Sequence, residues 1–247
     1  MKDIKDNFSN QAKAYAQFRP SYPSELFDFI YSRCNRFDKA WDCATGNGQA
    51  AIELAKRFEE VSATDISERQ ISLAEKAHNI DYRICPAHNT PFADDTFDLI
   101  TVAQALHWFA IDEFYNEVKR VAKSGAFFAA WGYSLMRCND EIDAIVDEFY
   151  TNVIGPYWDA ERKHVDDEYS SLPFPFDEVE CPTFHIKYNR SYEDLIGYFN
   201  SWSSVQHYIN QKGTNPVQLI AEPLKHAIGS NIVEVTFPIF MRGGYVK

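Results

Sequence analysis

Between residues 39 and 131 the chain alternates short apolar segments with longer segments whose apolar residues recur at helical spacing. Short apolar runs are typical of buried strands, and recurrence every three to four residues is typical of helices. The expected strands are Lys39–Cys43, Glu60–Asp65, Asp81–Cys85, Phe97–Ala103 and Ala126–Trp131, and the expected helices are Gln49–Phe58 and Ile111–Ala122. Ser67 is expected to cap a further helix, with Gln70 at the capping-box position. This alternation predicts an α/β fold with a parallel sheet covered by helices on both faces.

The pattern changes after Trp131. Proline and aromatic residues cluster in GPYW at 155–158 and in LPFPF at 172–176. The expected elements of this half are helices over Met136–Ile154 and Tyr192–Trp202 and strands over Pro182–Asn189 and Ile232–Phe240. We expect it to return two strands to the sheet and to lay a cap over the ligand-binding edge.

Composition narrows the class of protein. The 247 residues are 45% hydrophobic and 24% charged, which suits one globular domain able to bury roughly three-quarters of its surface. A net charge of −12 disfavours binding to nucleic acid. The charged start, MKDIKDNFSN, the lack of a long apolar run and five cysteines without C-x-x-C spacing predict a reduced, cytoplasmic protein with no membrane segment and no metal.

Candidate chemistry lies where the first expected strand meets the first helix, in DCATGNGQAA at 42–51. Glycines at Gly46 and Gly48 let the backbone approach a ligand and leave helix N-terminal N–H groups open. Asp65 ends the next strand, about 20 residues after the turn begins, where an acidic residue accepts ribose hydroxyls. The turn also matches G-x-G-x-x-A through Ala51. This order of elements predicts a nucleoside-type ligand, although the same turn can serve structure alone.

Asp42 helps to choose between two such ligands. A dinucleotide would place its pyrophosphate against this turn, and a carboxylate there would repel it. S-adenosylmethionine instead presents an ammonium group and a sulfonium. Asp42 therefore favours S-adenosylmethionine over NAD, with stabilisation of the turn as the alternative role for this side chain.

Several motifs are similar to those of class I S-adenosylmethionine-dependent methyltransferases: D-x-A-x-G-x-G at 42–48, the strand end at Asp65 and FDLITVAQALHWF at 97–109. FSNQAKAYAQFRPSYP at 8–23 and SWSSVQHY at 201–208 more narrowly resemble the small-molecule branch that contains trans-aconitate methyltransferases. The resemblance implies a Rossmann-like, doubly wound, mostly parallel seven-stranded sheet within a single domain, 1–247. It further implies helical lid segments at 1–38, a donor-binding core at 39–131, and a cap insertion with the final strands at 132–247.

The resemblance also assigns roles to residues. The methionine portion of S-adenosylmethionine would lie on Asp42, Ala44, Gly46 and Gly48, its ribose on Asp65, its adenine beside Ile66, Ala87 and His88, and its carboxylate end near Tyr15 and Arg19 of the lid. Two positions depart from the family pattern. His88 stands where many relatives carry an acidic residue, and Ala44 stands where many carry glycine.

Gln104, His107 and Trp108 follow the fourth expected strand and are the candidate catalytic residues, with Gln104 also expected beside the donor. His107 has the pKa range of a general base, and Trp108 could attract the sulfonium through its ring face. The alternatives are a hydrogen-bonded histidine that supports the loop and a core aromatic residue. We expect methyl transfer to a small molecule, such as a carboxylic acid, by a monomer or homodimer. An NAD-linked oxidoreductase and a non-catalytic donor-binding regulatory protein are the alternatives.

Overall fold

The computed structural model describes residues 21–247, and its centre is a mixed sheet with the strand order β3-β2-β1-β4-β5-β8-β6. The parallel strands are β1 (Lys39–Cys43), β2 (Glu60–Asp65), β3 (Ile80–Ile84), β4 (Phe97–Ala103) and β5 (Ala122–Tyr133). The expected parallel core is thus confirmed, with β5 longer at both ends than its apolar run. The carboxyl ends of these strands meet at one edge, which is where open α/β sheets bind ligands.

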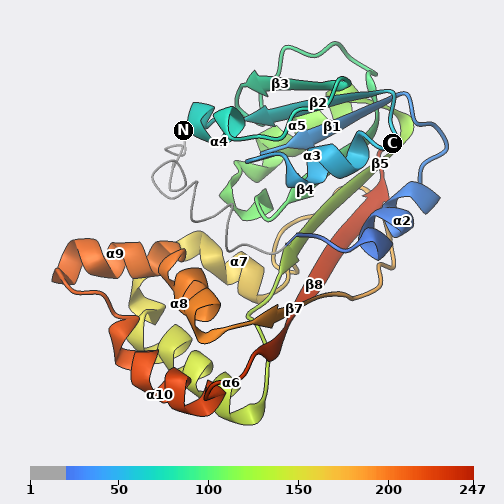
Figure 1. Ribbon diagram of the computed structural model, residues 1–247. Helices are drawn as coiled ribbons and strands as arrows, with labels where there is room; N and C mark the ends of the chain where they lie inside the picture. Colours follow the sequence, from blue (N-terminus) through green and yellow to red (C-terminus); the bar gives the residue numbers. More distant parts are fainter. Residues whose placement is uncertain (1–20) are drawn as a thin grey trace.

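The sheet holds eight strands within the described residues, where seven were expected. Seven of them form the continuous path, and β7 (Phe184–Arg190) lies off it. The reason is the length of β8 (Val233–Tyr245), which runs for 13 residues. From Ile239 onward β8 pairs antiparallel with β5, its end also pairs with β6 (Asp177–Val179), and its first half leaves the core to pair with β7 (Figure 1).

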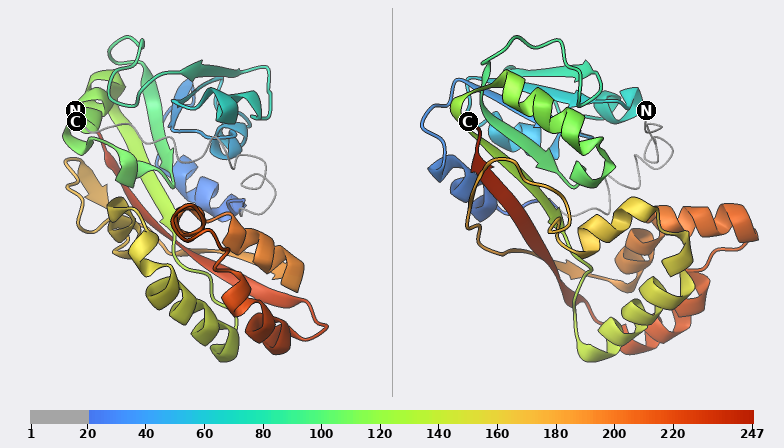
Figure 2. Two further views of the ribbon diagram at one scale, coloured as in Figure 1. Left: turned by 90° about the vertical axis from the view of Figure 1, so that its left-hand side faces the viewer. Right: turned by 180° about the vertical axis from the view of Figure 1, so that it is seen from behind.

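Helices cover both faces of the parallel strands (Figure 2). On one face lie α2 (Ser24–Ser32) and α3 (Gln49–Leu54), which share a core cluster with the strands; α5 (Ile111–Val121) packs on the other face. The short α4 (Glu68–Ser72) is capped by Ser67, whose hydroxyl accepts the N–H of Gln70 as predicted.

The second half builds a helical cap beside the core (Figure 1). Its elements are α6 (Asp140–Glu148), a π-helix (Phe149–Val153), 3-10 turns at Gly155–Tyr157 and Ala160–Arg162, α7 (Lys163–Asp166), α8 (Tyr192–Asn200), α9 (Ser203–Lys212) and α10 (Gln218–Ile228). The single helix expected over Met136–Ile154 begins later than predicted, at Asp140. The Asn139 side chain caps it by accepting the N–H of Ile142.

Residues 1–20, which include Tyr15 and Arg19, lie outside the described part of the chain. The rest of the segment expected as a lid contains α2, whose Leu26 and Ile30 are fully buried. Phe27 packs edge-on against Trp131, with ring centroids 6.1 Å apart. This helix is therefore a layer of the core. No helix within residues 21–247 is long and apolar enough to cross a membrane.

Candidate functional site

The turn between β1 and α3 has one open glycine and one enclosed glycine. Gly46 has φ +57°, and a Cβ placed there would meet no atom within 4 Å. Gly48 has φ +85°, and its Cβ would lie 2.3 Å from the Tyr82 hydroxyl on β3. The N–H of Thr45 donates to the carbonyl of Thr64 at 2.9 Å and so fastens the turn to β2. Gly46 therefore leaves open space beside the turn, whereas at Gly48 it is the left-handed backbone that favours glycine.

Two residues at this edge adopt left-handed backbone without being glycine. Ala44 has φ +55° and Gln104, directly after β4, has φ +56°. Such a conformation costs an L-residue about 1–2 kcal/mol, and strain of this kind gathers at functional sites. The departure from glycine at Ala44 thus leaves the turn geometry intact at a cost in strain.

Asp42 lies under the turn and is 1% exposed. Its carboxylate accepts the hydroxyl of Thr45 at 2.5 Å and that of Thr101 at 2.8 Å. Burial raises the pKa of Asp42 to about 6, although these hydrogen bonds act to lower it. Asp42 therefore organises the turn and also places a negative charge beneath it.

Asp65 joins two turns at the end of β2. One carboxylate oxygen accepts the N–H of Gly46 at 2.9 Å, and the other accepts the N–H of Ser67 at 2.8 Å. The next side chain, Ile66, is 39% exposed. A carboxylate beside an exposed apolar side chain can accept hydroxyl groups while a flat ring covers the isoleucine.

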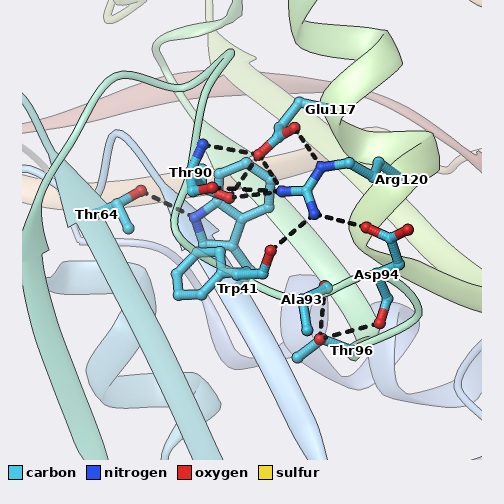
Figure 3. Close-up of polar contacts among 9 residues, drawn as sticks. Trp41, Thr64, Thr90, Ala93, Asp94, Thr96, Glu117 and Arg120 are labelled. Carbon is cyan, nitrogen blue, oxygen red and sulfur yellow. Dashed lines mark hydrogen bonds and ion pairs between the residues drawn. The ribbon is translucent and has the colours of Figure 1, made fainter.

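The loop after β3 carries Ala87, half-buried, and His88, exposed. An ion pair on α5, between the buried Glu117 and the partly exposed Arg120, holds the continuation of this loop (Figure 3). One oxygen of Glu117 accepts the N–H of Thr90 at 2.8 Å and its hydroxyl at 2.6 Å, and the Arg120 guanidinium donates to both oxygens.

Arg120 also reaches the far side of the loop, where it donates to the carbonyl of Phe92 at 2.7 Å and to Asp94 at 2.8 Å. Burial acts to raise the pKa of Glu117, but the bonds from Arg120 and Thr90 outweigh it and hold that pKa below its usual value. Sequence reasoning missed this pair. The available signal was an acid and a base at i, i+3 of an amphipathic helix, a spacing that places them side by side.

Gln104 turns its amide toward β5. The side-chain Oε1 of Gln104 accepts the N–H of Tyr133 at 2.9 Å, and its Nε2 lies 3.5 Å from the Tyr133 carbonyl oxygen. Its backbone N–H donates to the carbonyl of Trp131 at 2.7 Å. Its amide thus extends the pairing between β4 and β5 and fixes the start of the segment 104–108.

His107 is 7% exposed, and its Nδ1 lies 3.1 Å from the hydroxyl of Tyr169. Burial raises the pKa of Tyr169, and the backbone N–H groups of Leu106 and His107 face its oxygen. The imidazole and the protonated phenol of Tyr169 are therefore within hydrogen-bond distance of each other in the closed interior. The ring of Trp108 lies 4.7 Å from the imidazole ring, centroid to centroid. This arrangement favours support of the loop by His107; its action as a base stays a prediction.

The carboxyl edge of β1, β2 and β4 thus brings together Asp42, Gly46, Asp65, Ile66 and the segment 104–108. Known proteins match the same region: residues 41–130 fit the family model described as a methyltransferase domain. A protein of Dictyostelium discoideum named as a methyltransferase is 37% identical over 245 residues, covering 96% of this chain and 93% of that protein. The chain belongs to the class I S-adenosylmethionine-dependent methyltransferases.

Two further proteins extend the comparison. A solved structure described as a type II methyltransferase from Anaeromyxobacter dehalogenans is 38% identical to this methyltransferase, with a TM-score of 0.86 over 93% of this chain and 98% of that chain. A Saccharomyces cerevisiae protein named as an S-adenosylmethionine-dependent methyltransferase is 29% identical over 137 residues, covering 51% of this chain and 47% of that protein. The comparisons therefore confirm the enzyme class that the motifs indicated and the methyl donor that Asp42 favoured.

The open Gly46, the anionic Asp42 and the exposed Ile66 fit a cationic donor with an apolar ring. Within residues 21–247, no group of three or more His, Cys, Asp or Glu side chains is suited to hold a metal ion. Which residues of this methyltransferase contact the donor stays a prediction. The pH dependence of ligand affinity tests the role of Asp42.

Affinity for S-adenosylhomocysteine, which keeps the donor's ammonium group, is expected to fall about tenfold from pH 7 to pH 5. Folding raises the pKa of Asp42, so this carboxylate in the folded protein is protonated as pH falls through about 6 and loses the charge that attracts the ammonium. The stability of the ligand-free protein changes in the opposite direction, because ionisation of Asp42 as pH rises through about 6 lowers the free energy of unfolding. Calorimetric titration across this range measures the effect. Asp42→Asn should give a flat profile, and a parallel decline in both proteins would refute the assignment.

Proposed function

We propose that this methyltransferase methylates a small carboxylic acid at the place where the cap meets the carboxyl edge of the sheet. The observation that carries the proposal is the contact between the two halves: the turn Ala160–Arg162 of the cap packs against Leu106–Trp108, the segment after β4. An acceptor bound there would lie beside the donor edge. The resemblance of 8–23 and 201–208 to the branch with trans-aconitate methyltransferases supports the same acceptor class.

The donor would be held by the turn at Gly46 with the Asp42 charge beneath it, by Asp65 at the ribose and by Ile66 with Ala87 at the adenine. S-adenosylmethionine, when bound, supplies a methyl carbon activated by its sulfonium; the acceptor's lone pair forms the new bond to that carbon as the carbon–sulfur electron pair returns to sulfur. A carboxylate acceptor has no proton to lose, so a base at His107 is not required. The work of the protein is to align the two groups and exclude water.

The aromatic residues of the cap are suited to excluding water from the reacting groups. Tyr150, Trp158, Tyr198 and Trp202 pack ring against ring, with centroid distances of 5.2 Å between Tyr150 and Trp158 and 5.6 Å between Trp158 and Trp202. Reaction between a carboxylate and a sulfonium cancels both charges. A dry, weakly polar environment therefore favours it, since water stabilises the separated charges more than the neutral products.

Calorimetric titration with S-adenosylhomocysteine, with NADH as the control, tests the donor site first. Micromolar binding of S-adenosylhomocysteine alone is the expected result. A panel of small carboxylic acids, each paired with its alcohol and amide, is then incubated with methyl-labelled S-adenosylmethionine, and methyl ester is measured. Turnover of the alcohols or amides in place of the acids would refute the acceptor class while leaving the donor site in place.

A further inference from the structure

The second half contains Arg137, which is paired with Asp147, and three other arginines that could meet an anionic acceptor. Arg242 donates to both carboxylate oxygens of Glu178 and to the carbonyls of Tyr169 and Leu172. Arg190 lies on β7, away from the core, and stacks over the ring of Tyr188 at 4.5 Å. Every nitrogen of Arg242 is thus engaged, and Arg190 lies at the end of β7 that pairs with Val233, away from the part of β8 that pairs with the core.

Arg162 differs from both. Its guanidinium carbon lies 4.8 Å from the ring centroid of Trp158 and 5.5 Å from that of Tyr150, and its side chain is 18% exposed. Its Nε donates to the Tyr150 hydroxyl at 2.8 Å and lies 3.2 Å from a carboxylate oxygen of Asp166. Among the residues from 21 onward neither terminal nitrogen has a hydrogen-bond partner, and neither is sealed from solvent. One edge of the guanidinium is occupied and the other is available.

The position of Arg162 connects it to the reaction. It ends the turn that packs against Leu106–Trp108, and α7, which follows it directly, lies on the side of the cap that faces the core (Figures 1 and 2). Its partner Tyr150 belongs to the π-helix Phe149–Val153, a rare geometry that occurs frequently at functional sites. The irregular helix, the rings and the available guanidinium edge therefore converge at the cap–core contact.

We propose that Arg162 binds a carboxylate of the acceptor through its two terminal nitrogens, while the rings of Tyr150 and Trp158 contact the acceptor's apolar body. The inference rests on the proposed function and names the residue that selects its substrate. Planar guanidinium and carboxylate groups pair by two parallel hydrogen bonds, which are stronger in a partly dry site. Asp166 lies on the opposite, Nε edge and is 47% exposed, so water screens its charge.

The bound carboxylate is distinct from the atom that takes the methyl group. A guanidinium paired with the attacking oxygen would withdraw its electron density and oppose the displacement. Arg162 therefore anchors one carboxylate of the acceptor so that an oxygen of a second carboxylate reaches the methyl carbon near segment 104–108. Its role is to position and to discriminate, and it forms no bond to the methyl group.

Phenylacetate is the probe for this subsite and phenylacetamide is its neutral match, each titrated by tryptophan fluorescence into protein saturated with S-adenosylhomocysteine. Wild-type protein is expected to prefer the acid at least tenfold. Arg162→Gln is expected to abolish that preference without changing S-adenosylhomocysteine affinity. Arg190→Gln, the same change at an arginine already stacked on Tyr188, is the control and should keep it. Arg162→Lys should retain a reduced preference, and it replaces Arg162→Gln should that variant fail to fold.

Equal affinity for the acid in wild type and Arg162→Gln, or no binding of the acid to wild type, overturns this inference alone. Full retention of the preference in Arg162→Lys also overturns it, since two-point pairing would then be unnecessary. Tighter binding of phenyl phosphate than of phenylacetate overturns the carboxylate assignment. Failure of wild type to bind S-adenosylhomocysteine overturns the proposed function and this inference with it.

Discussion

Replacing Asp65 by alanine is expected to weaken S-adenosylhomocysteine binding about 100-fold. The carboxylate receives the N–H groups of Gly46 and Ser67, so its removal releases the open turn and the start of α4 together. It also removes the acceptor that we propose for the ribose hydroxyls. Hydrogen bonds to a charged group contribute about 1.5–3 kcal/mol each, and the loss of two at the lower figure corresponds to about two orders of magnitude in the dissociation constant.

Calorimetry measures this loss, and two variants define its cause. Asp65→Asn keeps one acceptor oxygen and should recover part of the affinity. Asp81→Ala removes a carboxylate that is 56% exposed and paired with Arg83 on β3, and it should leave the affinity unchanged. An Asp65→Ala protein that melts like wild type and binds within threefold of it would refute the donor site.

Replacing Arg120 by methionine is expected to lower the free energy of unfolding by about 3 kcal/mol at pH 7. The variant leaves the Glu117 carboxylate, whose side chain is 8% exposed, without its cation. Breaking a buried ion pair from one side costs about 3–5 kcal/mol, and the 35% exposure of Arg120 places this pair at the lower end. Urea denaturation measures the change. Arg137→Met, which breaks an exposed pair with Asp147, should cost less than about 1 kcal/mol.

The pH dependence separates this ion pair from simple packing by Arg120. Folding lowers the pKa of Glu117, so the stabilisation is present above the pKa of the unfolded chain and is lost as pH falls through the folded value. The stability difference between wild type and Arg120→Met should therefore shrink near pH 4. A difference that stays the same at pH 7 and pH 4 would show that the pair contributes through packing alone.

The elements that depend on local pattern could be predicted from the sequence. The bounds of β4 match its apolar run, and the Ser67 cap forms through a bond only three residues long. The three-residue β6 could not be predicted, because it is defined by its pairing with β8 far along the chain. The helices α9 and α10 were also missed; α10 contains Pro223, which normally argues against a helix interior.

The site residues also divide into those set by local pattern and those set by the fold. The positions of Asp42, Gly46 and Asp65 could be predicted from strand ends and turn residues. The hydrogen-bond partners of site residues could not, since Asp42 is held by Thr101, 59 residues away, and His107 by Tyr169, 62 residues away. Spacing indicates which side chains reach the sheet edge, and only the folded chain shows which of their hydrogen bonds are already satisfied.

The continuity of β8 limits how the length of this protein can change. One strand runs from the core into the cap, changing partners at Ile239 next to Pro238, which has no N–H to donate. Each residue advances a strand by about 3.4 Å and reverses the direction of the side chain. A single insertion within Val233–Ile239 would displace the cap and turn the buried faces of Val235 and Phe237 outward. Insertions and deletions should therefore accumulate in the surface turns between cap helices. The number of residues in β8 should stay constant, because it sets the distance between the core and the cap.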